Sequence, residues 1–282
     1  MPFKSCSNAP KGNVMIKKMI KSVLFTIAPK TTIQLTAARA RRHAQMLEIN
    51  WGLVDETHRF VAKFGNVVCC GPFSGMRYPP RSLDRHVTDK LLGTYEMELY
   101  PFLDEAINAG PEQVIDIGSA EGYYAVGMAR RLPDATIIAF DADGWARERT
   151  VEMAQVNGSS NLQTRGLCTG QWLVDNVWDK TLVIMDCEGC EVGITAPMAS
   201  CRSHLQSWWL IELHETQMPG VTRTLLQRFN KTHHTELCTS RSRDRGDLPG
   251  FLKSEMDLPV LKWMDEHRDP GQQWLLCRPR PS

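Results

Sequence analysis

Residues 114–122 read VIDIGSAEG, an apolar run that leads into a turn with two glycines. The run Val114–Ile117 predicts a short buried strand. Gly118 and Gly122 predict a tight turn in which the backbone can approach a ligand closely. A helix is expected directly afterwards, from about Glu121 to Leu132. A strand, a glycine-containing turn and a helix in this order are typical of the opening unit of a parallel α/β sheet.

Strands and helices continue to alternate toward the C-terminus. Alternating strands and helices form a parallel sheet with both faces covered. We therefore expect an α/β fold built on a Rossmann-like, doubly wound, mostly parallel seven-stranded sheet. The last two strands flank a long insertion, 241–270, and are the pair that could run antiparallel. The further strands are expected at 136–141, 162–168, 181–186, 208–213, 235–239 and 272–277, and further helices at 144–157 and 221–230.

The first 110 residues have a different pattern and are expected to form a helical N-terminal extension or lid, 1–110, ahead of a ligand-binding domain, 111–282. Segment 13–27 places its apolar residues on one helical face and lysines on the opposite face. Two interpretations stay open: a peripheral contact with an anionic membrane surface, or a helix docked on the domain with its basic side in solvent. We favour the docked helix. The other elements expected here are helices at 31–50 and 89–108 and a strand or hairpin at 65–80.

The composition is that of an ordinary globular protein. Of 282 residues, 42% are apolar and 23% are charged, which excludes a disordered chain, a collagen-like chain and a small disulfide scaffold. The net charge of +1 gives no electrostatic reason to expect nucleic acid as a partner. Residues 1–47 nevertheless hold nine Lys or Arg and no acid. The sequence contains neither a run of 18 apolar residues nor a secretory signal, so no membrane span is expected.

The cysteines predict a reducing compartment. Nine are present, an odd number, and several lie in strongly apolar runs, so we expect reduced thiols in a cytoplasmic protein. Cys187 and Cys190 form a single CxxC pair with no second pair nearby. Because a structural zinc site needs more ligands than two, metal binding by cysteine is not expected.

The turn after the first strand is the first candidate ligand site, because ligands of open α/β sheets bind at the carboxyl ends of the strands. Its GxxxG spacing differs from the GxGxxG spacing of dinucleotide sites and better suits a nucleoside with an amino-acid tail. Asp116 can neutralise the ammonium group of such a tail. A tight turn without a ligand is the alternative. The expected contacts are Asp116, Gly118, Ser119, Ala120, Glu121, Gly122 and Tyr123.

Asp141 is the second candidate, at the end of the second strand and about 25 residues after Asp116. A carboxylate at that place is the usual partner of a ribose diol, because it can accept from two hydroxyls at once. Capping of helix 144–157 is the alternative role. We assign the cap to Asp143 and the ribose contact to Asp141.

Two later strand ends carry further acids and a histidine. The segment 186–191 reads DCEGCE, and its three carboxylates repel one another unless a cation or hydrogen-bond donors balance them. A solvated acidic turn is the alternative. Strand alternation puts Glu212 and His214 on one side of their strand. His214 is a natural general base, although a core histidine paired with a carboxylate is a serious competitor.

Taken together, these segments resemble class I S-adenosylmethionine-dependent methyltransferases, and most specifically the FkbM-type group. Residues 114–124 resemble the first motif of the class, and AFDAD at 139–143 resembles the next stretch. The DxEGxE pattern of 186–191, followed by IELH at 211–214, resembles the most distinctive pattern of the group. The likeness covers roughly 112–240, in the right order and spacing.

The resemblance implies transfer of the sulfonium methyl group of S-adenosyl-L-methionine to a hydroxyl, commonly on a sugar, glycan or polyketide-like acceptor. The candidate catalytic residues are His214, Asp186 and Glu188, and Asp186 also lies beside the donor. A divalent metal such as Mg²⁺ on Asp186, Glu188 and Glu212 is a further possibility. Two positions depart from the group. Met185 stands where a lysine is frequent, and Asp141-Ala142 stands where Glu-Pro is frequent.

Two rival functions remain open from the sequence. A catalytically inactive nucleoside-binding module could keep the fold and dock a partner through the basic N-terminus. A nucleotide-dependent oxidoreductase would share the sheet, but it would need the tighter glycine spacing and would leave 186–191 unexplained. The expected partner is a small-molecule or glycan acceptor, and the sequence specifies no oligomeric state.

Overall fold

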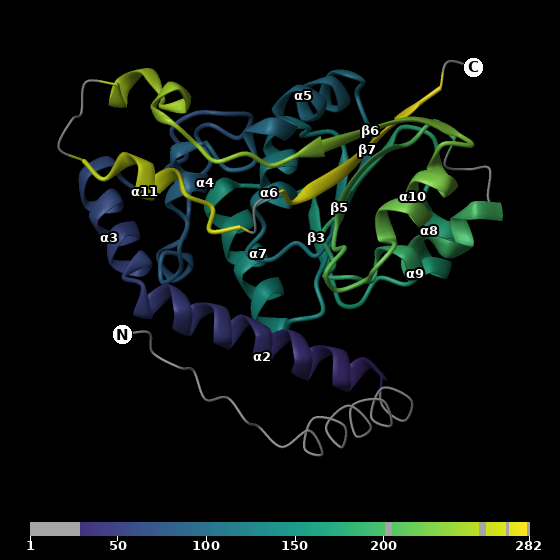
Figure 1. Cartoon of the computed structure of the whole chain (residues 1–282), viewed down its shortest axis with the longest axis horizontal. Helices are drawn as coiled ribbons and strands as arrows, with labels where there is room; N and C mark the ends of the chain where they lie inside the picture. The colour runs from purple at the N-terminus through teal and green to yellow at the C-terminus, as the bar shows by residue number, and fades with distance from the viewer. Residues whose placement is uncertain (1–28, 201–204, 254–257, 269–270, 281–282) are drawn as a thin grey trace, which may run out of the picture.

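The computed structural model describes residues 29–200, 205–253, 258–268 and 271–280. Their centre is a seven-stranded sheet with the order β3-β2-β1-β4-β5-β7-β6 (Figure 1). Strands β1 to β5 run parallel, whereas β7 is antiparallel to both β5 and β6. This confirms the expected doubly wound, mostly parallel sheet and its antiparallel last pair. The strands are β1 (Gln113–Ile117), β2 (Thr136–Phe140), β3 (Leu162–Arg165), β4 (Thr181–Met185), β5 (Trp208–Leu213), β6 (His233–Thr239) and β7 (Gln273–Pro279).

Side chains of the central strands alternate between two apolar layers, one on each face of the sheet. On β1, Val114 packs in the first layer and Ile115 and Ile117 pack in the second. Burial on both faces explains why these strands are apolar throughout. Helices α5 (Tyr100–Asn108), α6 (Tyr123–Arg131), α7 (Gly144–Asn157) and α11 (Val260–Met264) cover the first layer, and α8 (Gly170–Asn176), α9 (Glu191–Thr195) and α10 (Val221–Phe229) cover the second (Figure 1).

The same alternation places the acids of the predicted site. Asp116 in β1 and Glu212 in β5 lie two residues after members of the first layer. Asp141 and Asp186 lie one residue beyond β2 and β4 and continue the same alternation. The four acids therefore gather on the α6 and α7 side of the sheet, at its carboxyl edge.

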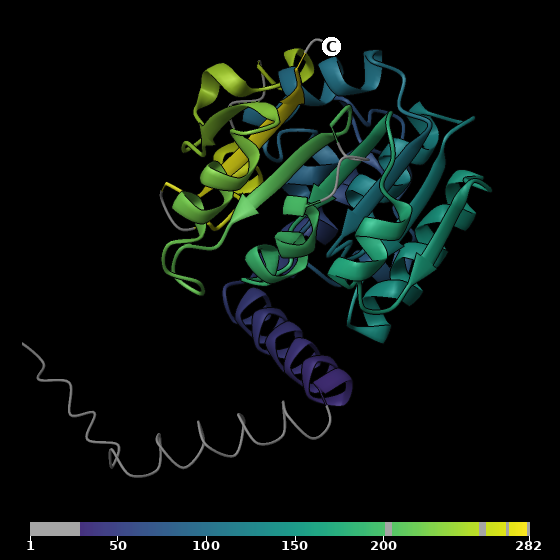
Figure 2. The ribbon, with the colours of Figure 1, turned by 90° about the vertical axis from the view of Figure 1, so that its right-hand side faces the viewer.

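Helix α2 (Pro29–Asn50) lies beside this carboxyl edge, below the domain in Figure 2. Arg41 Nε donates a hydrogen bond of 2.6 Å to Oδ2 of Asp143, the residue that caps the start of α7. Arg85 donates two hydrogen bonds, of 2.6 and 2.7 Å, to Glu48 of α2. Several apolar side chains of α2 are exposed. Ion pairs, rather than a buried apolar face, therefore attach α2 to the domain.

The segment between α2 and β1 packs into the first apolar layer through α3 (Leu53–Phe64), α4 (Thr88–Leu92) and α5. The expected hairpin at 65–80 is reduced to one antiparallel bridge, between Val67 and Arg77. The prediction of a single helix at 89–108 is wrong, because α4 ends at Leu92 and α5 begins at Tyr100. Gly93 has a φ of 77°, and a Cβ there would lie 2.0 Å from the Cys70 carbonyl oxygen.

The other elements follow the sequence closely. The predicted helix 144–157 and strand 208–213 are confirmed with their bounds, whereas β3 ends at Arg165 rather than at 168. The short helices α3, α8 and α9 were not expected. Segment 13–27, with its predicted membrane or docking contact, lies outside the described residues. Within the described residues, the cysteines are free thiols and no helix is long and apolar enough to cross a membrane.

Asn157 ties the 65–80 segment to the end of α7. Its Oδ1 accepts from Arg77 N at 2.8 Å and its Nδ2 donates to Arg77 O at 2.8 Å. Asn157→Ala removes both bonds and is expected to lower the free energy of unfolding by about 1–2 kcal/mol in urea denaturation. Gln155→Ala, at an exposed position of α7, is the matched control and is expected to stay within about 0.5 kcal/mol. Equal midpoints for the two variants would contradict a stabilising role for this pairing.

Candidate functional site

The turn after β1 lies directly against the end of β4. Gly118 has a φ of 92°, and a Cβ there would lie 1.6 Å from the carbonyl oxygen of Asp186. Asp186 N also donates to Ile117 O at 2.8 Å. Only glycine permits this approach. The turn 118–122 and the loop 186–191 are therefore positioned together.

The amides at the start of this turn are bonded within the protein. Gly118 N and Ser119 N donate to Phe140 O at 2.8 and 3.0 Å. Ala120 N donates to Asp141 Oδ2 at 3.0 Å. These three bonds fasten the turn to the end of β2, and they leave the contacts with a ligand mainly to side chains.

Asp116 is buried, with 3% of its surface exposed, and its Oδ2 has no hydrogen-bond partner among the described residues. The buried hydroxyl of Ser119 also lacks a partner in the described part of the chain. Burial raises the pKa of Asp116 to about 8, and the charges of Asp186 and Asp141 add to this effect. A buried polar group without a partner costs free energy. A cationic or hydrogen-bond-donating ligand would therefore gain most at this position.

Asp141 is held in place by two backbone amides. Oδ1 accepts from Asp143 N at 2.8 Å and Oδ2 accepts from Ala120 N. Asp143 caps α7 by accepting from Trp145 N at 3.0 Å, which confirms its predicted role. Burial raises the pKa of Asp141 to about 6 against the opposing effect of the two amides. Above that pH the ionised carboxylate has further lone pairs for the hydroxyls of a diol.

His214, directly after β5, has carboxylates at both ring nitrogens. Nδ1 lies 2.7 Å from Glu191 Oε1, and Nε2 lies 3.4 Å from Asp186 Oδ1 and 3.7 Å from Glu188 Oε2. Burial acts to lower the pKa of His214, but the hydrogen bond to Glu191 and the charges of Asp186, Glu191 and Glu188 raise the pKa above its usual value. Glu191 is fully buried and so fixes the orientation of the ring.

Glu212 is joined to the C-terminal part of the chain by a half-buried arginine. Arg268 Nη1 donates to Glu212 Oε1 at 2.8 Å, and Nη2 donates to Tyr95 OH and to Glu96. Burial raises the pKa of Glu212 to about 10, and Asp186 adds to this effect while Arg268 opposes it. Tyr95 and Glu96 come from the segment before α5, so Arg268 connects that segment to the carboxyl edge.

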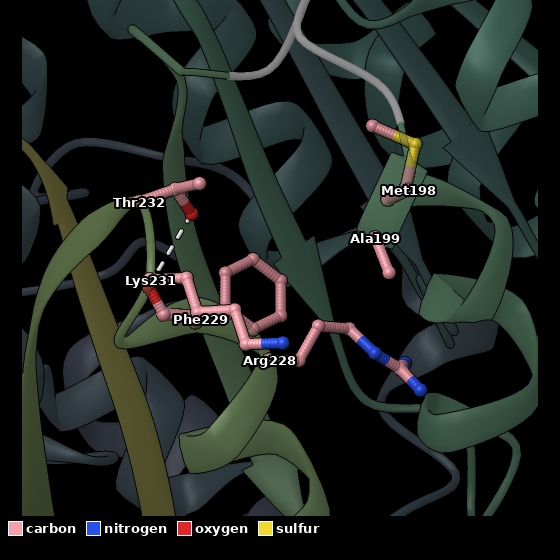
Figure 3. A pocket seen from close by; sticks show the side chains of 6 residues that line it. All are labelled: Met198, Ala199, Arg228, Phe229, Lys231 and Thr232. Atoms are coloured by element: carbon pink, nitrogen blue, oxygen red, sulfur yellow. Dashed lines mark hydrogen bonds between the residues drawn. The ribbon is translucent and has the colours of Figure 1, made fainter.

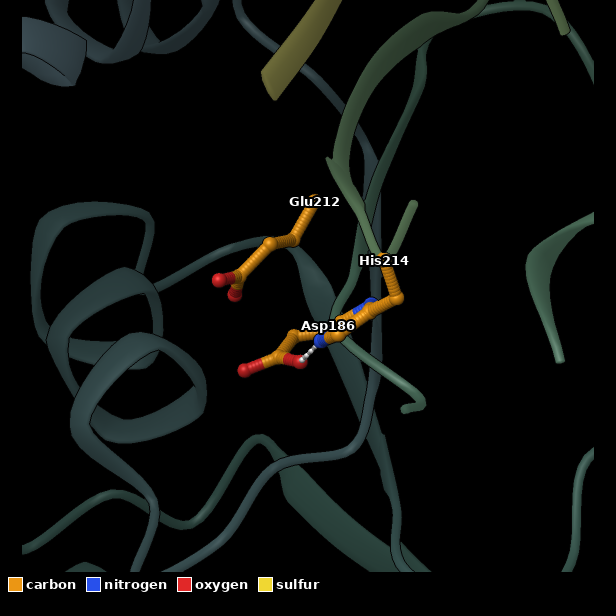
Figure 4. A group of neighbouring side chains, drawn as sticks. All are labelled: Asp186, Glu212 and His214. Atoms are coloured by element: carbon orange, nitrogen blue, oxygen red, sulfur yellow. Dashed lines mark ion pairs between the residues drawn. The ribbon is translucent and has the colours of Figure 1, made fainter. Parts of the chain in front are cut away.

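Asp186, Glu212 and His214 are the described side chains that could hold a metal ion. Their ligand atoms all lie within 4.8 Å of one another, and Figure 4 shows Asp186 and His214 paired beneath Glu212. The set differs from the expected Asp186, Glu188 and Glu212, because the Glu188 side chain is 78% exposed. Arg268 already places a positive charge on Glu212, which opposes the binding of a second cation.

Two expected ligand contacts have other partners. Glu121 Oε1 accepts from Lys90 Nζ at 2.5 Å. Tyr123 is buried and packs edge-on against Phe73 and Tyr95, with ring centroids 5.1 and 5.3 Å apart. These contacts fasten the segment before β1 to the start of α6. The buried hydroxyl of Tyr123 has no hydrogen-bond partner among the described residues, and donor contacts of Glu121 and Tyr123 stay predictions.

Left-handed backbone conformations gather at the same edge. Glu96, Ala120 and Glu188 have φ values of 49°, 47° and 57°. Glu96 is a partner of Arg268, Ala120 lies in the turn after β1, and Glu188 lies in the loop after β4. Non-glycine residues in this region cost free energy and cluster at functional sites.

A small pocket lies at the opposite edge of the sheet. Lys231 and Thr232 line it and directly precede β6, which runs parallel to β5, so the pocket is at the amino edge. None of its lining residues belongs to the predicted site. Figure 3 shows the lining side chains, which are Met198, Ala199, Arg228, Phe229, Lys231 and Thr232.

Neither Glu191 nor Arg268 was predicted from the sequence to have a role in the site. Glu191 counted only as the third acid of 186–191. The signal that could have identified it is the charge excess, because three acids at one strand end need a donor and His214 follows the neighbouring strand. No motif in 241–270 marks Arg268, since its partners lie in distant parts of the chain.

Comparisons with known proteins concern the fold. No family model and no curated protein matches the chain in sequence. The structure is similar to an O-methyltransferase from Bacillus cereus in complex with SAH (9% identity, 81% of this chain and 91% of that chain, TM-score 0.45). It is also similar to an rRNA methylase from Streptococcus thermophilus (9% identity, 66% of this chain and 99% of that chain, TM-score 0.46). A third similar structure is a methyltransferase from Geobacter sulfurreducens (14% identity, 62% of this chain and 75% of that chain, TM-score 0.41).

Glu191→Gln tests the pairing of Glu191 with His214. The neutral amide removes a charge that raises the pKa of His214, so this pKa is expected to fall in an NMR titration of the imidazole ring. In the wild type, a folded-state pKa above the ordinary 6.5 adds stability at low pH, and this stability is lost as pH rises through the raised value. The variant is expected to lose that low-pH stability.

Glu188→Gln is the matched control for this titration. Its carboxylate is exposed and lies farther from the ring, so a smaller fall in the pKa of His214 is expected. Glu191→Asp keeps the charge and should restore part of the wild-type value. An equal effect of Glu191→Gln and Glu188→Gln would contradict a special role for Glu191.

Proposed function

We propose that this protein is an S-adenosylmethionine-dependent methyltransferase of the FkbM type that methylates a hydroxyl group. The observation that carries the proposal is the buried Asp116, whose Oδ2 has no partner among the described residues. This carboxyl lies beside the Gly118 turn, and its pKa responds to the charges of Asp141 and Asp186. A cation with hydrogen-bond donors, such as the ammonium group of an amino-acid tail, suits this position.

Three side chains would hold the donor. Asp116 would accept from the ammonium group, the unpartnered Ser119 hydroxyl would bind the same tail, and Asp141 would accept from the ribose hydroxyls. S-adenosylmethionine is a nucleoside with an amino-acid tail, and when bound it supplies an activated methyl group. Asp116 and Asp141 lie at the ends of adjacent strands, as the two parts of such a ligand require.

His214 is the proposed general base. Its Nε2 faces the half-exposed Asp186 and the exposed Glu188, whereas Glu191 occupies Nδ1. A hydroxyl is a poor nucleophile until its proton has an acceptor, and Nε2 can take that proton while Glu191 stabilises the resulting imidazolium. Because the ring must be neutral to accept a proton, we expect the rate to rise with pH through the pKa of His214.

The proposal also covers the acceptor, a metal ion and the cellular location. The acceptor, a small molecule or glycan with a sugar or polyketide-like hydroxyl, rests on the resemblance of 186–191 and 211–214. As an alternative to His214 as the base, Mg²⁺ on Asp186, Glu188 and Glu212 would lower the pKa of the acceptor hydroxyl. A cytoplasmic location is proposed from the odd number of cysteines, several of them in apolar runs. We propose no nucleic-acid partner.

Calorimetric titration with S-adenosylhomocysteine, with and without Mg²⁺, is the direct test. Micromolar binding is expected. An increase in affinity on addition of Mg²⁺ would favour the metal-assisted reaction. Failure to bind in both conditions would contradict the donor assignment and would favour a module without transferase activity.

Asp116→Asn is expected to weaken donor binding by more than about tenfold, or 1.4 kcal/mol, because the amide cannot neutralise the ammonium group. In the wild type, affinity for S-adenosylmethionine should rise between pH 6 and pH 8, since a bound cation favours the ionised carboxylate. The variant should lose this rise. Calorimetry measures both effects, and unchanged affinity at pH 7.5 would contradict the assignment.

The same substitution should stabilise the ligand-free protein. The folded-state pKa of Asp116 is about 8 against an ordinary 3.8, so the folded state holds a proton that the unfolded state has lost. Wild-type stability therefore falls as pH rises between these values, and Asn removes that loss. Urea denaturation at pH 7.5 measures the expected gain in the free energy of unfolding of the variant over the wild type. Asp134→Asn, at an exposed position, is the control without either effect.

His214→Ala separates catalysis from donor binding. Turnover, measured as S-adenosylhomocysteine formed with pooled hydroxyl acceptors, should fall by about 100-fold or more. Affinity for S-adenosylhomocysteine should change little, because the ring is not a proposed donor contact. His234→Ala, on the exposed side of β6, is the matched control. A large loss of donor affinity in a stable His214→Ala protein would contradict the assignment as base.

A further inference from the structure

The CxxC pair has no part in the proposed chemistry, although it frames the loop that carries that chemistry. Asp186 directly precedes Cys187, Glu188 lies between the two cysteines, and Glu191 directly follows Cys190. Any change in the distance between the two sulfur atoms therefore acts on the carboxylates around His214.

The backbone of this loop brings the two cysteines close together. Cys190 N donates to Cys187 O at 3.4 Å, and Glu188 and Gly189 between them have φ values of 57° and 97°. Two consecutive positive φ values are typical of a type I′ turn, whose end Cα atoms lie within about 7 Å. A disulfide requires Cα atoms about 4.4–6.8 Å apart. The turn thus sets the separation that a disulfide needs.

The exposure of the two thiols also suits such a reaction, because Cys187 is half-buried and Cys190 is exposed. Cys190 is exposed, so a disulfide in solution can reach it. The thiolate is the form that attacks a disulfide. Cys168 and Cys277, by contrast, are buried.

We propose that Cys187 and Cys190 form a reversible disulfide that controls the loop 186–191. The oxidant is a low-molecular-weight disulfide such as oxidised glutathione. The Cys190 thiolate attacks one of its sulfurs and releases one glutathione. Cys187 then loses its proton to solvent and attacks the Cys190 sulfur, releasing the second glutathione. Two thiols are oxidised to one disulfide, and one glutathione disulfide is reduced to two thiols.

Closing the disulfide would move one end of the loop. The two sulfurs must approach to about 2.05 Å. The Cys187 end is fixed, because Asp186 N bonds to Ile117 O and Gly118 lies against the Asp186 carbonyl. Any adjustment of the backbone on closure therefore falls on the Cys190 end, which Glu191 directly follows, and Glu191 lies 2.7 Å from His214 Nδ1. Oxidation is expected to loosen this pair. A weaker donor site in the oxidised form follows as well, and this part rests on the proposed function.

Mass spectrometry of the full-length protein tests the disulfide directly. Reduced protein is equilibrated in glutathione buffers of increasing oxidised fraction and then alkylated. The peptide with both cysteines is expected to lose two hydrogens in proportion to the oxidised fraction and to regain them with dithiothreitol. Hydrogen exchange over 186–195 and around His214 should differ between the two forms. Cys187→Ser should retain one glutathione on Cys190, whereas the control Cys69→Ser should still form the disulfide.

Three results would overturn the proposal. One is a persistent glutathione adduct on Cys190 of the unsubstituted protein. Another is a disulfide that leaves hydrogen exchange over 186–195 unchanged. The third is equal affinity of both forms for S-adenosylhomocysteine, since the oxidised form is expected to bind about fivefold or more weakly. If the reduced protein binds no S-adenosylhomocysteine, the proposed function fails, and the mass and exchange measurements still decide the disulfide.

Discussion

The burial of carboxylates, together with their mutual repulsion, constrains the carboxyl edge of the sheet. Strand alternation places Asp116, Asp141, Asp186 and Glu212 on one face of that edge, and Asp116 and Glu212 are buried there. The pKa of Asp116 rises to about 8 and that of Glu212 to about 10. Arg268 offsets the charge on Glu212, whereas Asp116 Oδ2 lacks a partner among the described residues. A cationic ligand would complete this balance, which is the physical basis for assigning the donor to Asp116.

Cations from segments far from the sheet in sequence pair with acids at this edge. Lys90 reaches Glu121 from the segment before β1, and Arg268 reaches Glu212 and Glu96 from the segment after α11. A buried ion pair adds little net stability, because desolvation of both charges offsets their attraction. Removal of one partner, however, leaves an uncompensated buried charge. These cations therefore fix where the two segments can dock.

Local sequence patterns made the strands of the sheet and the ends of helix 144–157 predictable. The features that the prediction missed depend on contacts between distant parts of the chain. Helix 144–157 follows from Asp143, which caps its start, and from Gly158, which ends it. The break at Gly93 was not predictable, because the carbonyl of Cys70 creates the requirement for glycine. Arg268 lies 56 and 172 residues from two of its acidic partners, so no local pattern could reveal it. The acids of the site were predictable by residue type, but which of them point inward depends on the turn after β4.

The turn after β4 places three carboxylates in three different environments within six residues. It keeps Asp186 beside the Gly118 turn, directs Glu188 toward solvent and buries Glu191 against His214. Two positive φ values produce the reversal, and they bring the first and fourth turn residues together whatever side chains they carry. Serine or alanine at 187 and 190 would satisfy the same backbone. The requirement to place the carboxylates therefore explains why these two positions are adjacent but not why both are cysteine, and the thiols call for a separate role.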